Sequence, residues 1–572
     1  MQLVAYGAQD VYLTGNPQIT FFKVVYKRHT NFSMEPIEQT FSGNAGFNKK
    51  VCVHVTRNGD LITNMYLRVE VPAVCVRDFD FNLKPHERLR TQFAWVRRLG
   101  HALIESVELE IGGSRIDKQY GNWFNIWYEL THDVGHEEGY AKMIGDVPEM
   151  VELSTPDPCT GRLKNKFTLY IPMQFWFCRN YGLALPLIAL QYHEVRLFFE
   201  FRHINELSIH SENICPKSLI DEVDNASLLV DYVYLDTEER RRFAQVSHEY
   251  LIEQLQTNNE ESITSNTWRG RLNFNHPCKF IVWAVRLGQY RNDNKFLAYE
   301  PFDWDRGLKT AAEKLIVAQY MMNECTSELI CDPDQCPGFV TEETVFTVDK
   351  DTGALDSNSE GRTVCKIDIG AVKKYVVLPD GTDLGCKVSG NIVVYEEHGK
   401  LFVHHINIIR NDLTIADISV PVDSYCVDNR NGWIQKLDLI VWQHDNYGLY
   451  IDGSCNPVCE AKLQLNGHDR FDELDGTYFN CVQPYQHFSN TPADGINVYS
   501  FALNPEDHQP SGAANFSRID TTELFIEFRR FDKDGRDVFR DCIDPETKIE
   551  VFTVNYNVLR IMSGMGGLAY SN

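Results

Sequence analysis

The stretch Val107-Glu-Leu-Glu-Ile-Gly-Gly-Ser-Arg-Ile-Asp117 has a second copy in this chain of 572 residues. The second copy reads Ala461-Lys-Leu-Gln-Leu-Asn-Gly-His-Asp-Arg-Phe-Asp472. In both copies apolar and polar residues alternate up to a turn dipeptide, Gly112-Gly113 or Asn466-Gly467. Alternation with period two predicts a strand with one buried face, and such a dipeptide predicts a tight hairpin. The stretch therefore predicts the same β-hairpin at two places.

Further matches accompany this hairpin, and all of them keep the same order in both halves. One short match alone could arise by chance, but several in order indicate two copies of one β domain, joined near Leu235–Val246. The matches are Ile37-Glu-Gln39 with Ile252-Glu-Gln254, Gly121-Asn-Trp-Phe-Asn125 with Gly476-Thr-Tyr-Phe-Asn480, and Leu197-Phe-Phe-Glu-Phe-Arg202 with Leu524-Phe-Ile-Glu-Phe-Arg529.

The spacing between matches predicts an insertion in the second copy. The chain advances 70 positions from Ile37 to Val107 but 209 from Ile252 to Ala461. The difference of about 139 residues falls at roughly Arg291–Ile440 and is the size of a small domain rather than a loop. This segment also shows alternation and carries a net charge of about −10. We expect a separate, mainly β unit that projects into solvent.

Helix signals are few, so the chain is predicted to be mainly β. Asn122 precedes Trp123, Ile126 and Trp127 at helical spacing and is a candidate N-cap. Asp236–Arg240 runs from acidic to basic residues, as suits a short helix with its dipole.

Composition limits the possible classes of protein. Hydrophobic residues make up 43% and charged residues 24%, which is typical of a globular protein. The net charge of −25 disfavours direct binding to nucleic acid, because an acidic surface repels phosphates. No apolar run approaches the ~20 residues of a transmembrane helix, and no signal peptide is evident, so we expect folding in the cytosol. The 16 cysteines are then expected to be small hydrophobes rather than disulfides.

The candidate chemical sites are weak, and no catalytic, cofactor-binding or metal-binding residue is predicted. For each of them, an ordinary loop, helix end or buried thiol explains the residues better than a ligand site does. The candidates are the histidines His132 and His136, the cysteines Cys325, Cys331, Cys336, Cys455 and Cys459, the acidic segment Phe531–Asp537, and the basic run Arg240–Arg242.

Longer motifs resemble the major capsid proteins of nucleocytoplasmic large DNA viruses. The similarity covers nearly the whole chain, is weakest across Arg291–Ile440, and carries no catalytic residues. The motifs are Gly7–Lys23, Gln174–Asn180 with Leu183–Leu190, Leu235–Gln245, Gln483–His487, Gln509–Asp520 and Tyr556–Tyr570.

The resemblance implies an all-β fold of two tandem eight-stranded jelly rolls, with a large β insertion in the second. We expect an N-terminal arm at 1–22, a first jelly roll at 23–236 and a second at 237–572, with the inserted subdomain at about 291–440. The implied function is that of a structural subunit of an icosahedral shell, which assembles in the host cytoplasm and becomes part of the virion. Homotrimers would form pseudo-hexagonal capsomers and contact neighbouring capsomers and minor and penton proteins.

The arm Met1–Phe22 has one charged residue, Asp10. We expect it to lie along the inner face of the shell and to contact neighbouring capsomers, minor proteins or an inner viral membrane.

Two other classes of protein share jelly rolls. A carbohydrate-binding protein would need a polar or aromatic cluster at one loop end, and a cupin-type enzyme would need a histidine-rich metal cluster, for which His404-His405 alone is too little. A stable trimer in gel filtration would favour the shell subunit over both.

Overall fold

The computed structural model describes most of the chain outside the insertion and nine strands within it. The described residues are 8–76, 93–151, 156, 160–210, 223–258, 260–286, 456–528 and 546–570, and in the insertion 340–345, 347–348, 355–356, 363–367, 388–397, 400–410, 415–418, 426–428 and 436–441.

The strands between Phe32 and Leu235 form two sheets that enclose a common core. One sheet has the order β1-β13-β3-β10 with β9 also on β3, and the other has the order β2-β11-β6-β7. Their bounds are β1 Phe32–Thr40, β13 Asn225–Leu235, β3 Leu61–Val71, β10 Leu185–Pro186, β9 Phe167–Pro172, β2 Lys50–His54, β11 Val195–Phe201, β6 Ile104–Ile111 and β7 Ser114–Tyr120. Two small strand pairs lie beside them, β4 (Val74–Cys75) with β8 (Arg162–Lys164) and β5 (Phe93–Trp95) with β12 (Ser208–His210).

The strands from His248 to Leu568 form a second sandwich. One sheet has the order β14-β33-β17-β30 with β15, β31 and β34 at its margins, and the other has the order β16-β32-β27-β28 with β29 on β27. Their bounds are β14 His248–Thr257, β33 Lys548–Met562, β17 Pro277–Arg286, β30 Ile496–Ser500, β15 Glu261–Ser262, β31 Ala514–Asn515, β34 Met565–Leu568, β16 Thr267–Arg271, β32 Thr522–Phe528, β27 Val458–Leu465, β28 His468–Asp469 and β29 Leu474–Asp475.

Both sandwiches share one strand order. Counting their eight principal strands along the chain, one sheet holds the first, eighth, third and sixth strands, and the other holds the second, seventh, fourth and fifth. In the first sandwich these strands are β1, β2, β3, β6, β7, β9, β11 and β13, and in the second they are β14, β16, β17, β27, β28, β30, β32 and β33. This order is the jelly roll, so the predicted double jelly roll is confirmed.

The sequence matches fall on corresponding strands. Ile37–Gln39 and Ile252–Gln254 lie on the first strand of each sandwich, and the matched hairpins are β6-β7 and β27-β28. The turn residues Gly112-Gly113 and Asn466-Gly467 all have positive φ, between 52° and 83°, as a hairpin of this type requires. The internal duplication is therefore structural as well as sequential.

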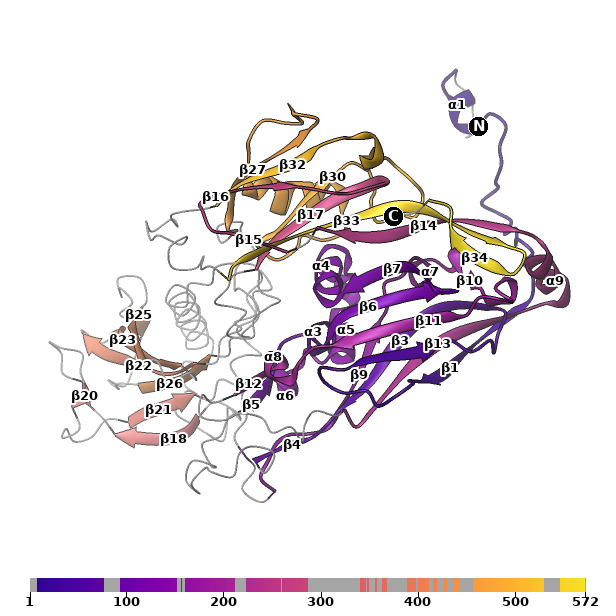
Figure 1. The fold of residues 1–572 in the computed structure, drawn as a ribbon. Coiled ribbons are helices and arrows are strands. Elements are labelled where there is room, and N and C mark those ends of the chain that lie inside the picture. The colour runs from indigo at the N-terminus through magenta and orange to yellow at the C-terminus, as the bar shows by residue number, and fades with distance from the viewer. Residues whose placement is uncertain are drawn as a thin grey trace, which may run out of the picture.

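The insertion lies between the third and fourth strands of the second sandwich, after β17 and before β27. Its described strands pair only with one another, in agreement with a separate β unit, and Figure 1 shows them beside the two sandwiches. Their bounds are β18 Val340–Val345, β19 Thr347–Val348, β20 Leu355–Asp356, β21 Thr363–Ile367, β22 Val388–Glu397, β23 Lys400–Arg410, β24 Ile415–Ile418, β25 Cys426–Asp428 and β26 Lys436–Val441.

The helices in the described residues are short. They are α1 Asp10–Thr14, α3 Leu99–Leu103, α4 Gly121–Thr131, α5 Glu137–Ile144, α6 Pro148–Val151, α7 Trp176–Arg179, α8 Ile204–Leu207, α9 Thr237–Gln245 and α13 Gln483–His487, with single turns η2 Val134–His136, η3 Tyr181–Leu183, η4 Leu187–Ala189, η6 Tyr478–Val482 and η7 Phe516–Arg518. Each of these helices is too short or too polar to cross a bilayer. Helix α9, the short helix predicted near Asp236–Arg240, joins the sandwiches. Its N-cap is Asp236, whose side chain accepts a hydrogen bond from Thr237 N–H.

The prediction of Asn122 as an N-cap was wrong. Helix α4 begins at Gly121, and Tyr120, two residues before Asn122, holds the cap position without a side-chain hydrogen bond. Asn122 is buried instead at the boundary between the sandwiches. A cap and a buried amide look alike in sequence, because both are a polar residue beside an apolar run.

Candidate functional site

The two sandwiches pack against each other along one boundary, and Figure 1 shows them stacked. Helix α4 and strand β7 of the first sandwich face the sheet β14-β33-β17-β30 of the second. Trp123 and Trp127 both stack on Phe280, with ring centroids 6.3 and 6.4 Å apart, and Trp123 also contacts Phe552. One hydrophobic cluster continues from the first core across this boundary.

Strand β17 is consequently buried on both faces. Phe280 and Val282 face the first sandwich, whereas Ile281 and Trp283 belong to the core of the second. A strand buried on both faces reads as an unbroken apolar run, which explains why Phe280–Val285 shows no alternation.

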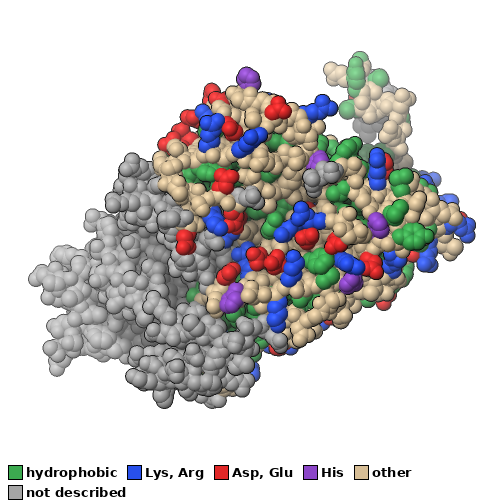
Figure 2. All heavy atoms as spheres, viewed as in Figure 1, with side chains coloured by type: hydrophobic (Ala, Val, Ile, Leu, Met, Phe, Trp, Pro, Cys, Tyr) green, Lys and Arg blue, Asp and Glu red, His purple; other side chains and the backbone are tan. Residues whose placement is uncertain are grey.

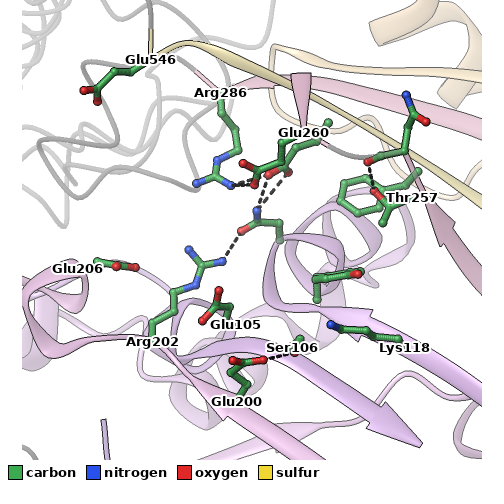
Figure 3. Close-up of a pocket in the computed structure, with 15 residues that line it drawn as sticks. Glu105, Ser106, Lys118, Glu200, Arg202, Glu206, Thr257, Glu260, Arg286 and Glu546 are labelled. Atoms are coloured by element: carbon green, nitrogen blue, oxygen red, sulfur yellow. Dashed lines mark hydrogen bonds and ion pairs between the residues drawn. The ribbon is translucent and has the colours of Figure 1, made fainter. Parts of the chain in front are cut away.

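A buried polar chain crosses the boundary beside the aromatic contact. Asn122 donates to both carboxylate oxygens of Glu550, at 3.0 and 3.1 Å, and accepts from Arg202 at 3.0 Å. Arg286 contacts the same carboxylate at 2.5 Å. In Figure 3 Arg202 and Arg286 point toward each other from opposite sandwiches. Burial and the neighbouring Arg286 lower the pKa of Arg202 to about 10.

A second polar cluster centres on Glu253 of β14. Its carboxylate lies 2.7 Å from Arg179 of the first sandwich and 2.8 Å from Lys279, a lysine with no exposed side-chain surface. Burial alone would raise the pKa of Glu253, but Arg179, His508 and Lys279 lower it to about 2. Lys279 and Glu253 both lie in the second sandwich, so the pair of Arg179 with Glu253 is the one that links the two sandwiches.

Asp117 forms a third link. Its Oδ1 accepts from the backbone N–H of Leu255 at 3.0 Å, across the boundary, and its Oδ2 accepts from Gln119 at 2.9 Å. Burial raises the pKa of Asp117 to about 6, although both hydrogen bonds act in the opposite direction. This carboxyl is therefore costly to hold ionised in the folded chain.

A cavity of about 540 Å³ opens between the sandwiches next to Asn122. Figure 2 shows acidic and basic side chains gathered along this boundary. The charged residues that line the cavity are Glu105, Glu200, Glu206, Glu260, Glu546 and Glu550, with Lys118, Arg202 and Arg286. Within the described ranges, no group of three or more His, Cys, Asp or Glu side chains is arranged to hold a metal ion.

The two histidines of the candidate metal cluster have separate contacts. His132 stacks on Tyr128 at 4.7 Å and lies 2.9 Å from Asn490 of the second sandwich, so it is part of the boundary. His136 is exposed and lies 3.3 Å from Asp133. The predicted solvated loop describes His136 but not His132.

The basic run Arg240–Arg242 lies in the middle of α9 rather than at a solvated helix end. Arg240 pairs at 2.9 Å with the buried carboxylate of Asp60, and Arg241 lies 3.4 Å from Glu238. Cys459 is half-buried. The other candidates, namely Cys325, Cys331, Cys336, Cys455, Phe531–Asp537 and the side chains of His404-His405, lie outside the described residues.

The N-terminal arm carries a row of exposed apolar side chains. In the described part of the arm and the residues just after it, the large apolar side chains are between 68% and 99% exposed, and Figure 1 shows α1 standing away from both sandwiches. They are Val11, Tyr12, Leu13, Ile19, Phe21, Phe22, Val24, Val25 and Tyr26. Such a row is costly in water and is typical of a segment that another molecule covers.

Two stacked jelly rolls in one chain are the fold of a double jelly-roll shell protein. Family comparisons give the same class. Residues 20–236 match the model described as major capsid protein N-terminus, and residues 239–567 match that of the large eukaryotic DNA virus major capsid protein. The chain belongs to this large eukaryotic DNA virus major capsid protein family.

Relatives cover the chain from end to end. It is 47% identical to capsid protein 1 of Acanthamoeba polyphaga mimivirus and 39% identical to the major capsid protein of Phaeocystis pouchetii virus, over 100% of this chain and 99% of each relative. Among solved structures, VP54 of PBCV-1 superposes with a TM-score of 0.59 at 29% identity, covering 97% of this chain and 100% of that one. The Faustovirus major capsid protein shares the fold, with a TM-score of 0.56 at 11% identity over 97% and 94% of the two chains.

Proposed function

We propose that three copies of this chain form a capsomer with a pseudo-hexagonal outline and that this capsomer is the repeating tile of an icosahedral shell. The chain is a capsid protein by family, and its two jelly rolls support the finer proposal. Two similar blocks per chain and three chains give six similar lobes, and hexagonal outlines tile a surface.

The observation that carries this proposal is the fixed boundary between the sandwiches. The Glu253 cluster and the Trp123–Phe280 stack hold the two blocks at one relative position. A tile needs this rigidity, because a hinge between the blocks would blur its outline. The role we propose is structural and not catalytic, with assembly in the host cytoplasm.

The domain limits fit the same proposal. We assign 1–22 to the arm, 23–236 to the first jelly roll and 237–572 to the second, with the inserted subdomain at about 291–440. The insertion separates the third and fourth strands, so it can vary without altering either sandwich. We propose that it decorates the outside of the shell.

The arm is proposed to bind the inner components of the shell. Its exposed apolar side chains favour an apolar partner, which we propose is a neighbouring capsomer, a minor capsid protein or the inner viral membrane. Direct binding to the genome is not part of the proposal, because the net charge of the chain is −25.

Native mass spectrometry of the purified full chain tests the trimer. We expect a dominant species at three times 65.9 kDa that resists dilution. A stable monomer or dimer at micromolar concentration would contradict the proposal.

A further inference from the structure

The segment Ile19-Thr-Phe-Phe-Lys-Val-Val-Tyr-Lys-Arg28, which we call the basic–apolar segment, spans the end of the arm and the residues just after it. Its six large apolar side chains are between 71% and 99% exposed. Its three charged side chains are all basic, in a chain whose net charge is −25. Exposed apolar side chains alone suit any apolar partner, but this combination favours an apolar partner that is also negatively charged.

A second basic group lies at the same end of the first sandwich. Phe32, the first residue of β1, pairs with Leu235, and α9 begins two residues after Leu235. The basic–apolar segment therefore enters the sandwich beside α9, which carries the exposed run Arg240–Arg242. Two of these arginines pair with carboxylates, so the run contributes less than three full positive charges. Figure 2 shows Lys and Arg side chains at the end of the molecule where Figure 1 places α9.

Exposed apolar side chains surround this end of the molecule as well. His248, which follows α9, pairs with Ile561 of β33. Directly after this pair, the hairpin β33-β34 turns, and Met562 and Met565 on either side of the turn are both more than half exposed. Tyr192 lies against the same turn and is 75% exposed.

The acidic insertion leaves from the opposite end of the second sandwich. Arg286, the last residue of β17, pairs with Lys548 at the start of β33, whereas Ile561 near the end of β33 pairs with His248. These two pairs are 13 residues apart along β33, or about 43 Å of extended strand. Figure 1 shows α9 and the described strands of the insertion at opposite ends of the molecule. The chain can therefore turn its basic end toward an anionic surface while the insertion, with its net charge of about −10, points away.

We propose that the basic–apolar segment binds an anionic lipid bilayer and that the end of the molecule around α9 faces this bilayer. Phe21, Phe22 and Tyr26 insert at the level of the headgroups, where aromatic rings are favoured. The basic side chains of the segment lie against the negative headgroups and add an electrostatic attraction. The inference rests on the proposed function, which places the arm at the inner face of the shell, and it selects one of the three partners named there.

The contact is expected to depend on the trimer and on salt. One segment of this size binds a bilayer weakly, but three segments of one trimer act together, because the first to bind holds the other two near the surface. Since the remainder of the chain is acidic, the basic side chains also decide whether the molecule can approach. Salt well above about 0.1 M is therefore expected to release the trimer from the bilayer.

Flotation of the purified full-chain trimer with lipid vesicles tests the inference. Vesicles of equal parts phosphatidylserine and phosphatidylcholine are expected to carry the unaltered trimer up a density gradient, whereas vesicles of phosphatidylcholine alone carry far less. The variants Phe21→Ser/Phe22→Ser and Lys27→Gln/Arg28→Gln should each raise the lipid concentration needed for half-binding roughly tenfold or more.

The matched control is Arg269→Gln/Arg271→Gln, which removes two exposed basic side chains from β16 of the second sandwich. It changes the net charge by the same amount as Lys27→Gln/Arg28→Gln, so it separates the position of the charges from their total. The control should bind the mixed vesicles like the unaltered chain, and melting temperatures show that every variant keeps the fold. Equal weakening by the control and by Lys27→Gln/Arg28→Gln would overturn the inference.

The inference and the proposed trimer can fail separately. A trimer, established by native mass spectrometry, that floats with neither kind of vesicle would overturn the inference and leave the proposed function standing. This is the result expected if the arm binds a minor capsid protein instead of lipid. A chain that floats with the mixed vesicles but never forms a trimer would support the lipid contact and overturn the proposed function.

Discussion

Gly121 and Gly476 occupy the same place in the two sandwiches, and each lies against a backbone carbonyl. A Cβ atom on Gly121 would lie 2.1 Å from the carbonyl oxygen of His101, and one on Gly476 would lie 2.1 Å from that of Val458. Each glycine precedes or begins the helical segment after the matched hairpin. The duplication has therefore kept a close approach that no larger residue permits.

Alanine at either glycine is expected to destabilise the chain. The added methyl group cannot avoid a backbone carbonyl, so Gly121→Ala and Gly476→Ala should each cost about 1–3 kcal/mol of unfolding free energy. Gly139→Ala is the control, because a Cβ there meets nothing within 4 Å. Denaturant unfolding should show that control unchanged or slightly more stable. Equal stability of all three variants would contradict the close approach of Gly121 and Gly476 to the backbone carbonyls.

Removal of Glu253 is expected to have a far larger effect than removal of Glu38. Glu253→Ala leaves the ammonium of Lys279 buried without its carboxylate partner. Breaking a buried ion pair in this way should lower the free energy of unfolding by about 3–5 kcal/mol. Glu38→Ala removes an exposed pair with Arg68 and should cost about 1 kcal/mol or less. Urea midpoints of the two variants make the comparison. Similar losses would contradict the contrast in burial between the two glutamates.

Asp117 is expected to make the stability of the chain depend on pH. Its pKa is about 6 in the folded chain, above its usual value of 3.8, so protonation favours the folded state. Its contribution is fully present below pH 3.8 and is lost as the pH rises through 6. Asp117→Asn should therefore gain stability relative to the unaltered chain at pH 7.5, by about 1–3 kcal/mol, and lose that advantage below about pH 4.

Melting temperatures measured across this pH range test the effect of Asp117. Asp472→Asn is the matched control, because Asp472 holds the same position in the exposed hairpin of the second sandwich. A constant difference between the Asp117 variant and the unaltered chain at every pH would show that ionisation is not responsible.

Deletion of Met1–Phe22 is expected to leave the trimer intact and to impair shell formation. The exposed apolar side chains of the arm make few contacts with the sandwiches, so the melting temperature should change little. Electron microscopy of cells that produce the truncated chain should show incomplete shells. Normal shells would remove the arm from the proposed contacts.

The insertion is expected to be the part of the shell that proteases reach first. Limited digestion of intact particles should cut within about 291–440 while both sandwiches stay whole. Mass spectrometry of the fragments identifies the cuts. Protection of the insertion, with cleavage elsewhere, would place it away from the outer surface.

Much of the fold could be predicted from the sequence, because alternation and turn chemistry are local signals. The matched hairpins, the position of the insertion and the short helix α9 all lie within a few residues of their signal. The internal duplication then allowed these local predictions to be applied to both halves of the chain. Each copy of the β domain predicts where the strands of the other copy lie.

The boundary between the sandwiches could not be predicted in the same way. Asn122 and Glu550 are 428 positions apart, and nothing near either residue in the sequence indicates the other. Glu38 and Glu253 stand in the same Ile-Glu-Gln motif, yet one is exposed and the other is buried. The unbroken apolar run Phe280–Val285 was the available signal, because such a run indicates a strand buried on both faces.

Cryo-electron microscopy of the purified oligomer tests the central claim most directly. The account predicts a ring of six lobes with threefold symmetry, in which first and second jelly rolls alternate and every lobe contacts two others. A ring of another number of lobes, or a trimer in which the two sandwiches of a chain do not touch, would contradict it.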